Sequence, residues 1–295
     1  MDWTPLLDFP LEWAALALLV AGCIYWERSG LSGLGVEGCV LSAMLGICLG
    51  YEWSGDYWIA SASGVAAALL FALLAGGLML LLRADPKVGS FALCLVPACG
   101  LGLATRAAPL RILSEFPSPG LIPGTLFEGT YAEDFLASPW FLAAPAFLAL
   151  AAFVILRTPF GLRLRAYSET PDLARGRWAQ VVRTRLFGAV LGALWAVPAA
   201  AILLRTHPES PPLGLGVIAL ACAVAGRWAF APGLLLVAGP AFLRAVRPYA
   251  HRSGTPEILL EAAPFLLAAV YLVLLSRRAL RASTTRQSRL DPDVL

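Results

Sequence analysis

The feature that most constrains this chain is an uncharged apolar run over residues 58–82, WIASASGVAAALLFALLAGGLMLLL. It has 25 positions, and about 20 consecutive apolar residues are enough for a helix to cross a bilayer. Charged residues make up 14% of the whole chain, against about 25% in an ordinary soluble domain. The sequence therefore predicts an integral membrane protein whose 295 residues leave no room for a large soluble domain.

Further apolar segments predict an all-α fold, a polytopic transmembrane helical bundle of about eight or nine membrane segments in one domain over residues 1–295. The segments cover residues 10–26, 29–51, 58–82, 88–104, 138–156, 186–204, 211–226, 228–243 and 258–276. Gly and Pro interrupt several of them, which membranes tolerate where neighbouring groups bond the freed backbone. The shortest segments fall below the length of a full crossing, so we expect some to be half-helices or re-entrant.

The basic residues predict how the bundle is oriented. Segment 157–185 carries seven arginines and two acids, and positive charge between membrane segments marks the cytoplasmic side. With this segment inside, alternation places 16 Lys and Arg residues on the cytoplasmic side and 6 on the outer side. We expect a bacterial inner-membrane protein with its N-terminus outside and its tail 277–295 in the cytoplasm. No basic region precedes the first apolar segment, which predicts a retained span rather than a secretory signal.

Aromatic side chains agree with these segment ends. Their amphipathic rings prefer the interface between membrane and water. Seven of them stand where a segment is predicted to begin or end: Trp26, Tyr51, Trp53, Tyr57, Trp58, Trp140 and Trp228.

A short amphipathic helix is predicted within the basic segment, over residues 170–181. Thr170 can cap its first turn, Pro171 suits the first helical position, and Asp172 complements the positive end of the helix dipole. A helix of this kind on the inner face of a multispan protein would suit docking of a cytoplasmic partner. The alternative is an ordinary solvated basic loop, because every multispan protein has basic inner loops.

Several kinds of chemistry find no support in the sequence. The only lysine, Lys87, stands in DPKVGS and not in the Gly-Lys-Ser/Thr of a phosphate-binding loop, so we expect ATP and Mg²⁺ to bind only a partner chain. The six cysteines lie in apolar runs and have no metal-ligand spacing with His207 or His251. No nucleophile and base stand at one depth, so we expect neither an enzyme nor a metal site. The basic residues are explained by inner loops and indicate no nucleic acid.

Glu37 and Glu261 fall within apolar segments, where ionisable groups are costly and usually face a cavity or a partner. Glu37 lies among glycines in SGLSGLGVEGCV, and a proton-coupled carrier would use such an acid as a relay. The alternative is a glutamate at a helix end that accepts hydrogen bonds from free backbone amides at a break. Glu261 lies close to the outer surface and is expected to snorkel.

Four ordered stretches resemble the permeases of ABC importers, in the nucleoside and simple-sugar subgroup of the branched-chain amino acid/ribose superfamily. The strongest is LRTPFGLRLRAYSETP at 156–171. The others are ERSGLSGLGVEG at 27–38, LRADPKVGSFAL at 82–93 and VIALACAVAGRWAFAPGLL at 217–235. They follow one another in the family's order and extend the resemblance over residues 27–276.

The resemblance implies a permease subunit that forms a path for nucleosides or simple sugars through the lipid bilayer and couples to a separate ATPase. The implied partners are an ABC ATP-binding subunit, a second homologous permease in a heterodimer, and an extracytoplasmic solute-binding protein. The coupling helix would contain Thr170, Pro171, Asp172, Leu173, Ala174 and Arg175. The coupling-loop motif would contain Arg157, Phe160, Gly161, Arg163, Arg165 and Glu169. The N-terminal permease motif would contain Glu27, Arg28, Ser29, Gly30, Gly35, Glu37 and Gly38.

The chain departs from the family pattern at several positions, among them Ala179 in place of an isoleucine. Gly33 stands in place of an asparagine, and Trp178, Trp195 and Pro198 replace residues of the family pattern, two of them in a stretch where small residues let helices pack tightly. Two other functions therefore stay open. One is a self-sufficient proton-coupled carrier, and the other is a degenerate permease or assembly subunit without transport.

Overall fold

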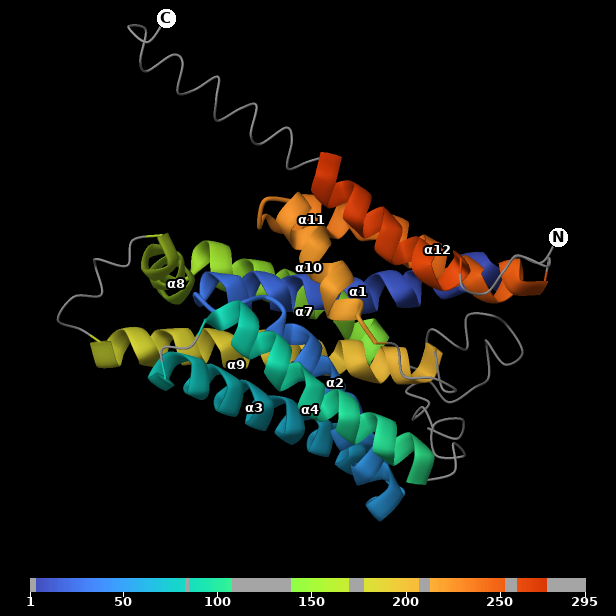
Figure 1. The fold of residues 1–295 in the computed structure, drawn as a ribbon, viewed down its shortest axis with the longest axis horizontal. Helices are drawn as coiled ribbons and strands as arrows, with labels where there is room; N and C mark the ends of the chain where they lie inside the picture. The colour runs from blue at the N-terminus through green and yellow to red at the C-terminus, as the bar shows by residue number, and fades with distance from the viewer. Residues whose placement is uncertain are drawn as a thin grey trace, which may run out of the picture.

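The computed structural model describes residues 4–82, 85–107, 139–169, 178–206, 213–252 and 259–274. Within these ranges the chain forms helices and short turns and no strand, which confirms the predicted all-α fold (Figure 1). The helices are α1 (Thr4–Arg28), α2 (Gly35–Ser54), α3 (Tyr57–Leu82), α4 (Pro86–Ala107), α7 (Pro139–Arg157), α8 (Pro159–Glu169), α9 (Trp178–Thr206), α10 (Leu215–Ala225), α11 (Phe230–Leu236) and α12 (Ala238–Arg252). A final helix covers Leu259–Leu274.

Seven helices in the described part of the chain are long and apolar enough to cross a membrane. They cover Asp8–Arg28, Gly35–Ser54, Tyr57–Leu80, Pro86–Ala104, Pro139–Arg157, Gln180–Thr206 and Phe230–Arg247. The final helix and α10 are shorter. With 11 residues, α10 is about 16 Å long, roughly half of the apolar thickness of a bilayer. The expectation of a half-helix among the short segments is thus confirmed for α10.

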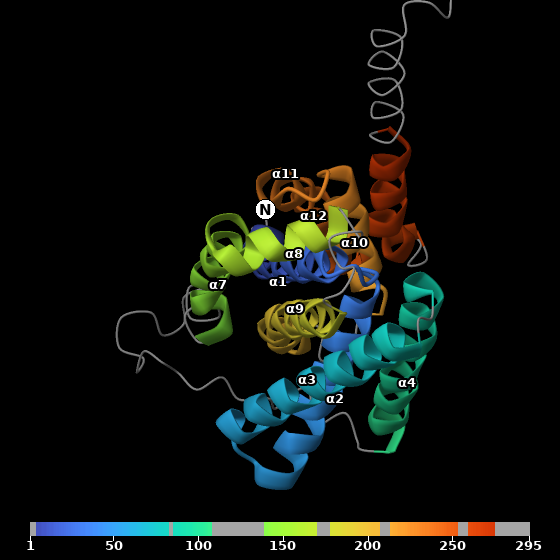
Figure 2. The ribbon, with the colours of Figure 1, turned by 90° about the vertical axis from the view of Figure 1, so that its left-hand side faces the viewer.

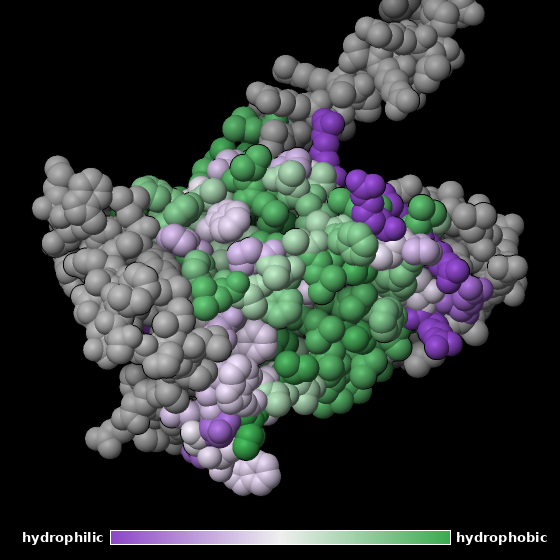
Figure 3. Space-filling model, turned by 180° about the vertical axis from the view of Figure 1, so that it is seen from behind, coloured by the Kyte–Doolittle hydropathy of each residue, from purple (hydrophilic) through white to green (hydrophobic). Residues whose placement is uncertain are grey.

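The helix α1 occupies the centre of the bundle. It packs against α9, α10, α12 and α7, and 83% of its membrane-crossing stretch is buried. The helices α2, α3 and α4 lie together on one side of α9, and α7 lies on another (Figures 1 and 2). Only 22% of the crossing stretch is buried in α4 and in α7. These two helices therefore present apolar surface outward. On the face opposite to that of Figure 1, a broad apolar region is visible (Figure 3).

Trp26 lies in the core and not at the membrane surface, so the prediction of an interfacial Trp26 is wrong. Its side chain has no exposed area, because it fits against two glycines, Gly35 of α2 and Gly192 of α9. A methyl group on Gly35 would overlap the indole ring. The missing side chains at these glycines thus make room for a large ring between three helices.

The basic segment contains a helix that was not predicted, before the predicted helix at 170–181. This helix is α8 at Pro159–Glu169. Of the predicted helix at 170–181, residues 170–177 lie outside the described residues, and residues 178–181 belong to α9. Thr158 caps α8, since its Oγ1 accepts a hydrogen bond from the Gly161 amide at 3.2 Å. A Thr-Pro pair thus starts a helix here, one motif earlier than the pair at 170–171, which lies outside the described residues.

Candidate coupling site at the basic end of the bundle

Four basic residues from separate elements lie at one end of the bundle, called the basic end below. They border two neighbouring pockets and are Arg28, Lys87, Arg165 and Arg227. The first pocket contains Arg28 and Lys87, and the second contains Arg28, Arg165 and Arg227. Successive connections between membrane segments alternate between the two sides, which predicts that these four residues share one side of the membrane. The structure brings them together.

The N-terminal permease motif forms the turn from α1 to α2 at this end. Glu27 Oε2 accepts a hydrogen bond from the Gly33 amide at 3.1 Å. The buried Ser29 donates from Oγ to the Tyr25 carbonyl at 2.7 Å. Gly30 has φ of 71°, in the left-handed region that glycine enters without strain. The first residues of the motif therefore fix a tight, internally bonded turn.

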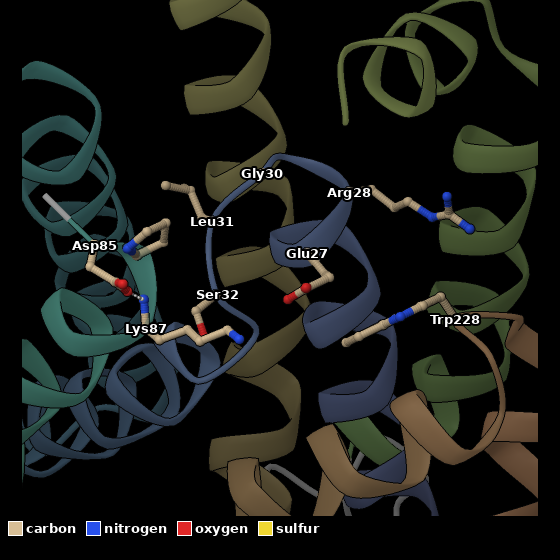
Figure 4. Close-up of a pocket in the computed structure, with 9 residues that line it drawn as sticks. Glu27, Arg28, Gly30, Leu31, Ser32, Asp85, Lys87 and Trp228 are labelled. Carbon is tan, nitrogen blue, oxygen red and sulfur yellow. Dashed lines mark hydrogen bonds between the residues drawn. The ribbon is translucent and has the colours of Figure 1, made fainter. Parts of the chain in front are cut away.

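A pocket of about 450 Å³ opens at this turn. It is lined by Glu27, Arg28, Gly30, Leu31, Ser32, Asp85, Pro86, Lys87 and Trp228. Lys87 extends from the start of α4 towards Ser32 and Glu27, whereas Arg28 points away from them (Figure 4). Asp85 Oδ1 accepts a hydrogen bond from the Lys87 amide at 2.8 Å and so caps α4. Three connections of the chain therefore meet around one polar pocket.

The coupling-loop motif forms α8, which lies across this end of the bundle (Figure 2). Its Leu164 is fully buried and, like the Ser29 hydroxyl, lies against Gly188 of α9. The Phe160 ring meets the Phe187 ring edge to face, with centroids 5.2 Å apart. The motif is thus docked on both α9 and the N-terminal motif.

Gly161 allows α8 to fold back on the end of α7. A methyl group there would come within 2.5 Å of the Val154 carbonyl oxygen and would also overlap that of Ile155. Side chains cannot occupy such a space next to a backbone. Outside this contact, Arg157 and Arg163 are exposed and Arg165 is half-buried.

Glu37 is buried in the first turn of α2, and its partners belong to α10. Its Oε1 accepts a hydrogen bond from the Gly214 amide at 2.6 Å, and its Oε2 accepts one from the Gly216 amide. These amides stand at the N-terminus of α10, where backbone donors lack helical partners and a negative charge is favoured. The interpretation of Glu37 as an acid bonded to free backbone amides at a break is therefore confirmed.

A profile of the family described as branched-chain amino acid transport system / permease component matches residues 8–245. This chain belongs to that family. It is a multi-pass membrane permease of the ABC transporter class, and such permeases are not enzymes themselves.

Curated relatives of the permease have names in the predicted subgroup. The guanosine ABC transporter permease protein NupQ of Bacillus subtilis is 29% identical over 73% of this chain and 72% of its own length. The putative glucose ABC transporter permease protein TsgC13 of Haloferax volcanii is 28% identical over 73% and 68%. The nucleoside ABC transporter permease protein NupC of Lactococcus lactis is 27% identical over 70% of each chain.

A solved structure supports the fold. PsaBC from Streptococcus pneumoniae in complex with Fab aligns with a TM-score of 0.51 and 13% identity, over 93% of the permease and 91% of that chain. The helical arrangement is thus shared despite little sequence similarity.

The structure brings two of the three predicted residue sets together. The N-terminal motif and α8 meet at the basic end, and Gly38 of the same motif lies further along α2, against the Phe71 ring of α3. The third set, Thr170, Pro171, Asp172, Leu173, Ala174 and Arg175, lies outside the described residues. Of the coupling-loop motif, Glu169 ends the backbone of α8.

The permease contains two ion pairs that were not predicted from the sequence. Arg244 Nε donates to Glu12 Oε2 at 2.9 Å, and both side chains are buried between α12 and α1. Arg247 Nη2 donates to Glu261 Oε1 at 2.5 Å in a more exposed pair, so Glu261 is paired as well as near the surface. A charge within an apolar segment usually faces a partner, so the positions of Glu12 and Glu261 in the sequence indicate that a partner exists. Which residue is the partner depends on the fold.

The position of Trp195 accounts for one departure from the family pattern. Its ring lies 5.9 Å from Tyr25 and 6.1 Å from Phe147, measured between centroids. The cluster fills the space between α9, α1 and α7. Trp195 is therefore accommodated by other large rings instead of by small residues.

Among the described residues, no group of three or more His, Cys, Asp and Glu could hold a metal ion. The six cysteines are free thiols. Four of them, Cys23, Cys39, Cys94 and Cys222, are buried, in line with their prediction as small apolar residues.

Proposed function

We propose that this permease is a transmembrane subunit of an ABC importer for nucleosides or related simple sugars. The contact between its two motifs at the basic end is the observation that carries the proposal. Gly188 of α9 lies against both Ser29 of the N-terminal motif and Leu164 of the coupling-loop motif. A displacement of the coupling-loop motif would therefore reach α1, the central helix, through directly packed groups.

The proposed mechanism assigns the basic end to the cytoplasm and the N-terminus to the outside. ATP draws two partner ATPase subunits together, and segment 170–181 with α8 follows their movement. The path then changes from inward-facing to outward-facing. The solute shifts this balance only through contacts that differ between the two states.

The proposed partners follow from the family and from the surface of the permease. They are the ATPase subunits, a second homologous permease in a heterodimer, and an extracytoplasmic solute-binding protein. Large apolar side chains on α4 and α7, such as Leu103 and Phe153, are exposed and suit contact with lipid or a second permease. The named solutes of the relatives, guanosine, nucleosides and glucose, define the solutes to test.

The deciding experiment is uptake of labelled guanosine and glucose by cells that express the full transporter. Replacing Asp172, Leu173 and Arg175 together by alanine should lower uptake about tenfold or more, in the range typical of lost coupling, while the ATPase still co-purifies. The matched control replaces Arg277, Arg278 and Arg281 in the tail by alanine and should leave uptake unchanged. Unchanged uptake in the Asp172 triple variant would contradict the proposed coupling role.

A proton-coupled carrier with Glu37 as its relay is the competing function. Both Glu37 oxygens accept backbone hydrogen bonds from α10, which favours a structural role. Purified permease in liposomes should transport nothing without the ATPase. Transport by the chain alone, with a pH dependence that Glu37→Gln abolishes, would establish the carrier instead. Assembly with the ATPase but no uptake of any solute would point to a degenerate permease.

A further inference from the structure

A second pocket at the basic end, of about 630 Å³, lies between α7, α8 and α11. It is called the arginine-rimmed pocket below. The motif residue Arg28 and Trp228 separate it from the polar pocket, since both residues line the two pockets. Arg28 and Arg165 belong to the two predicted motifs, but the mechanism proposed above assigns no ligand to the pocket itself.

The charge at the rim of this pocket has one sign. Arg28 ends α1, Arg165 lies on α8, and Arg227 lies in the turn after α10. None of the described residues that line the pocket is acidic. Arg227 and Trp228 have φ of 56° and 58°, so a left-handed turn presents both side chains at the rim. Three guanidinium groups from three elements favour an anion such as a phosphate diester.

The wall of the pocket is apolar and as deep as a lipid tail requires. On α7 it extends from Leu148 to Leu156 near the helix end, about 12 Å along the axis. On α11 it includes Leu234, next to Gly233, which lies against Val20 of α1. Half of a bilayer's apolar core is about 15 Å thick. The wall therefore runs from the charged rim through most of one leaflet.

We propose that the arginine-rimmed pocket binds one anionic phospholipid of the cytoplasmic leaflet. The lipid phosphate meets the arginines, and an acyl chain lies along α7 and α11. Basic pockets between helices at the cytoplasmic surface suit acidic headgroups, and the half-buried Trp228 is at the depth where indole rings gather. The choice of leaflet rests on the orientation in the proposed function, whereas binding itself does not.

Native mass spectrometry of the detergent-purified permease with its co-purifying subunits tests the charge requirement. The probes are dioleoylphosphatidylglycerol and dioleoylphosphatidylcholine. We expect preferential retention of the anionic lipid, and a loss of roughly thirtyfold in its affinity on Arg165→Gln with Arg227→Gln, from about 1 kcal/mol per charge. The control pair Arg163→Gln with Arg183→Gln removes two exposed arginines outside the pocket. Equal retention of both lipids, or an equal loss in the control pair, would overturn the proposal.

A second arm separates a lipid from a free phosphate. Ala152→Trp fills the apolar wall and should abolish retention of phosphatidylglycerol, while millimolar inorganic phosphate should not displace the lipid. Retention in Ala152→Trp, or displacement by phosphate alone, would show an anion site without a lipid tail and contradict the proposal.

A third measurement keeps all three arginines and so does not depend on the folding of the arginine variants. Phosphatidylglycerol brominated on its acyl chains should quench tryptophan fluorescence more in the native permease than in Trp228→Phe, and brominated phosphatidylcholine should show no such difference. Equal quenching in both proteins would overturn the proposal. These readouts need neither ATP nor solute, so their failure is distinct from failure of the proposed function.

Discussion

At the residue scale, Glu37 fixes the start of a helix that is 177 positions away in the chain. Its carboxylate accepts from the amides of Gly214 and Gly216, which have no other place in the helical ladder of α10. Because the N-terminus of the half-helix α10 lies within the bundle, its first amides cannot reach water and need a protein acceptor. Glu37 therefore belongs to the construction of the discontinuous segment.

Replacing Glu37 tests this role. Glu37→Ala leaves two buried amides unsatisfied and should lower the unfolding free energy by about 3 kcal/mol, measured by unfolding in detergent. Glu37→Gln keeps one acceptor oxygen and should cost about half as much. The control is Glu52→Ala, at the exposed end of the same helix. Unfolding of Glu37→Ala at the wild-type midpoint would rule out the capping role.

Gly161 offers a second test at a single position. Gly161→Ala places a methyl group against the carbonyl oxygens of Val154 and Ile155 and should destabilise by about 1–3 kcal/mol through overpacking. The matched control is Gly77→Ala in α3, where an added methyl group meets no atom within 4 Å. Thermal unfolding of both variants in detergent measures the difference. Equal midpoints would show that α8 can shift without cost.

What the sequence predicts at this scale depends on whether the signal is local. The backbone-bonded role of Glu37 could be predicted, because an acid among glycines in an apolar segment needs donors. Its partners could not, since nothing near Gly214 identifies Glu37. Trp26 was misplaced because its position near a segment end fits an interfacial ring, while the two glycines that bury it lie on other helices.

At the element scale, α8 shows how one signal can occur twice. Thr-Pro pairs at 158–159 and 170–171 both have the residue types that start a helix. Only the second pair was predicted to start a helix, although the predicted apolar segment 138–156 already ends just before the first pair. In the structure α7 ends at Arg157, one residue beyond the predicted end of that segment, and α8 begins at Pro159 and crosses the end of the bundle. The bounds of the charge-free segment 58–82 were predicted closely, since α3 covers Tyr57–Leu82 and the length of a charge-free run follows from the depth of the membrane.

The two ion pairs of α12 predict contrasting energies. Glu12→Gln leaves the Arg244 charge poorly compensated between α1 and α12, and should destabilise by about 3 kcal/mol or more. Glu261→Gln breaks a pair in which the Glu261 side chain is 56% exposed, and should cost less than about 1 kcal/mol. Unfolding in detergent compares the two. A larger effect at Glu261 would contradict the assignment of α12 to α1 as the tighter contact.

At the scale of the whole molecule, the grouping of basic residues at one end predicts the orientation of the permease. Asp56 lies at the opposite ends of α2 and α3 from the polar pocket, and Arg163 is exposed on α8. In a chain with Cys99→Ser, Asp56→Cys should react with an impermeant maleimide in intact spheroplasts. Arg163→Cys should react only after permeabilisation. The reverse pattern would invert the proposed orientation and contradict the cytoplasmic docking of α8.

The glycine at position 188 has a mechanical consequence. Leu164 and the Ser29 hydroxyl both lie against the backbone of α9 at Gly188. No flexible side chain of α9 therefore separates these two groups. No side chain of α9 can therefore change its rotamer at this point to absorb a displacement of α8. We expect even a small displacement of α8 to shift the end of α1 by a similar amount. The rigidity of this contact, more than the strength of any single hydrogen bond, thus determines how completely a movement of α8 is transmitted to α1.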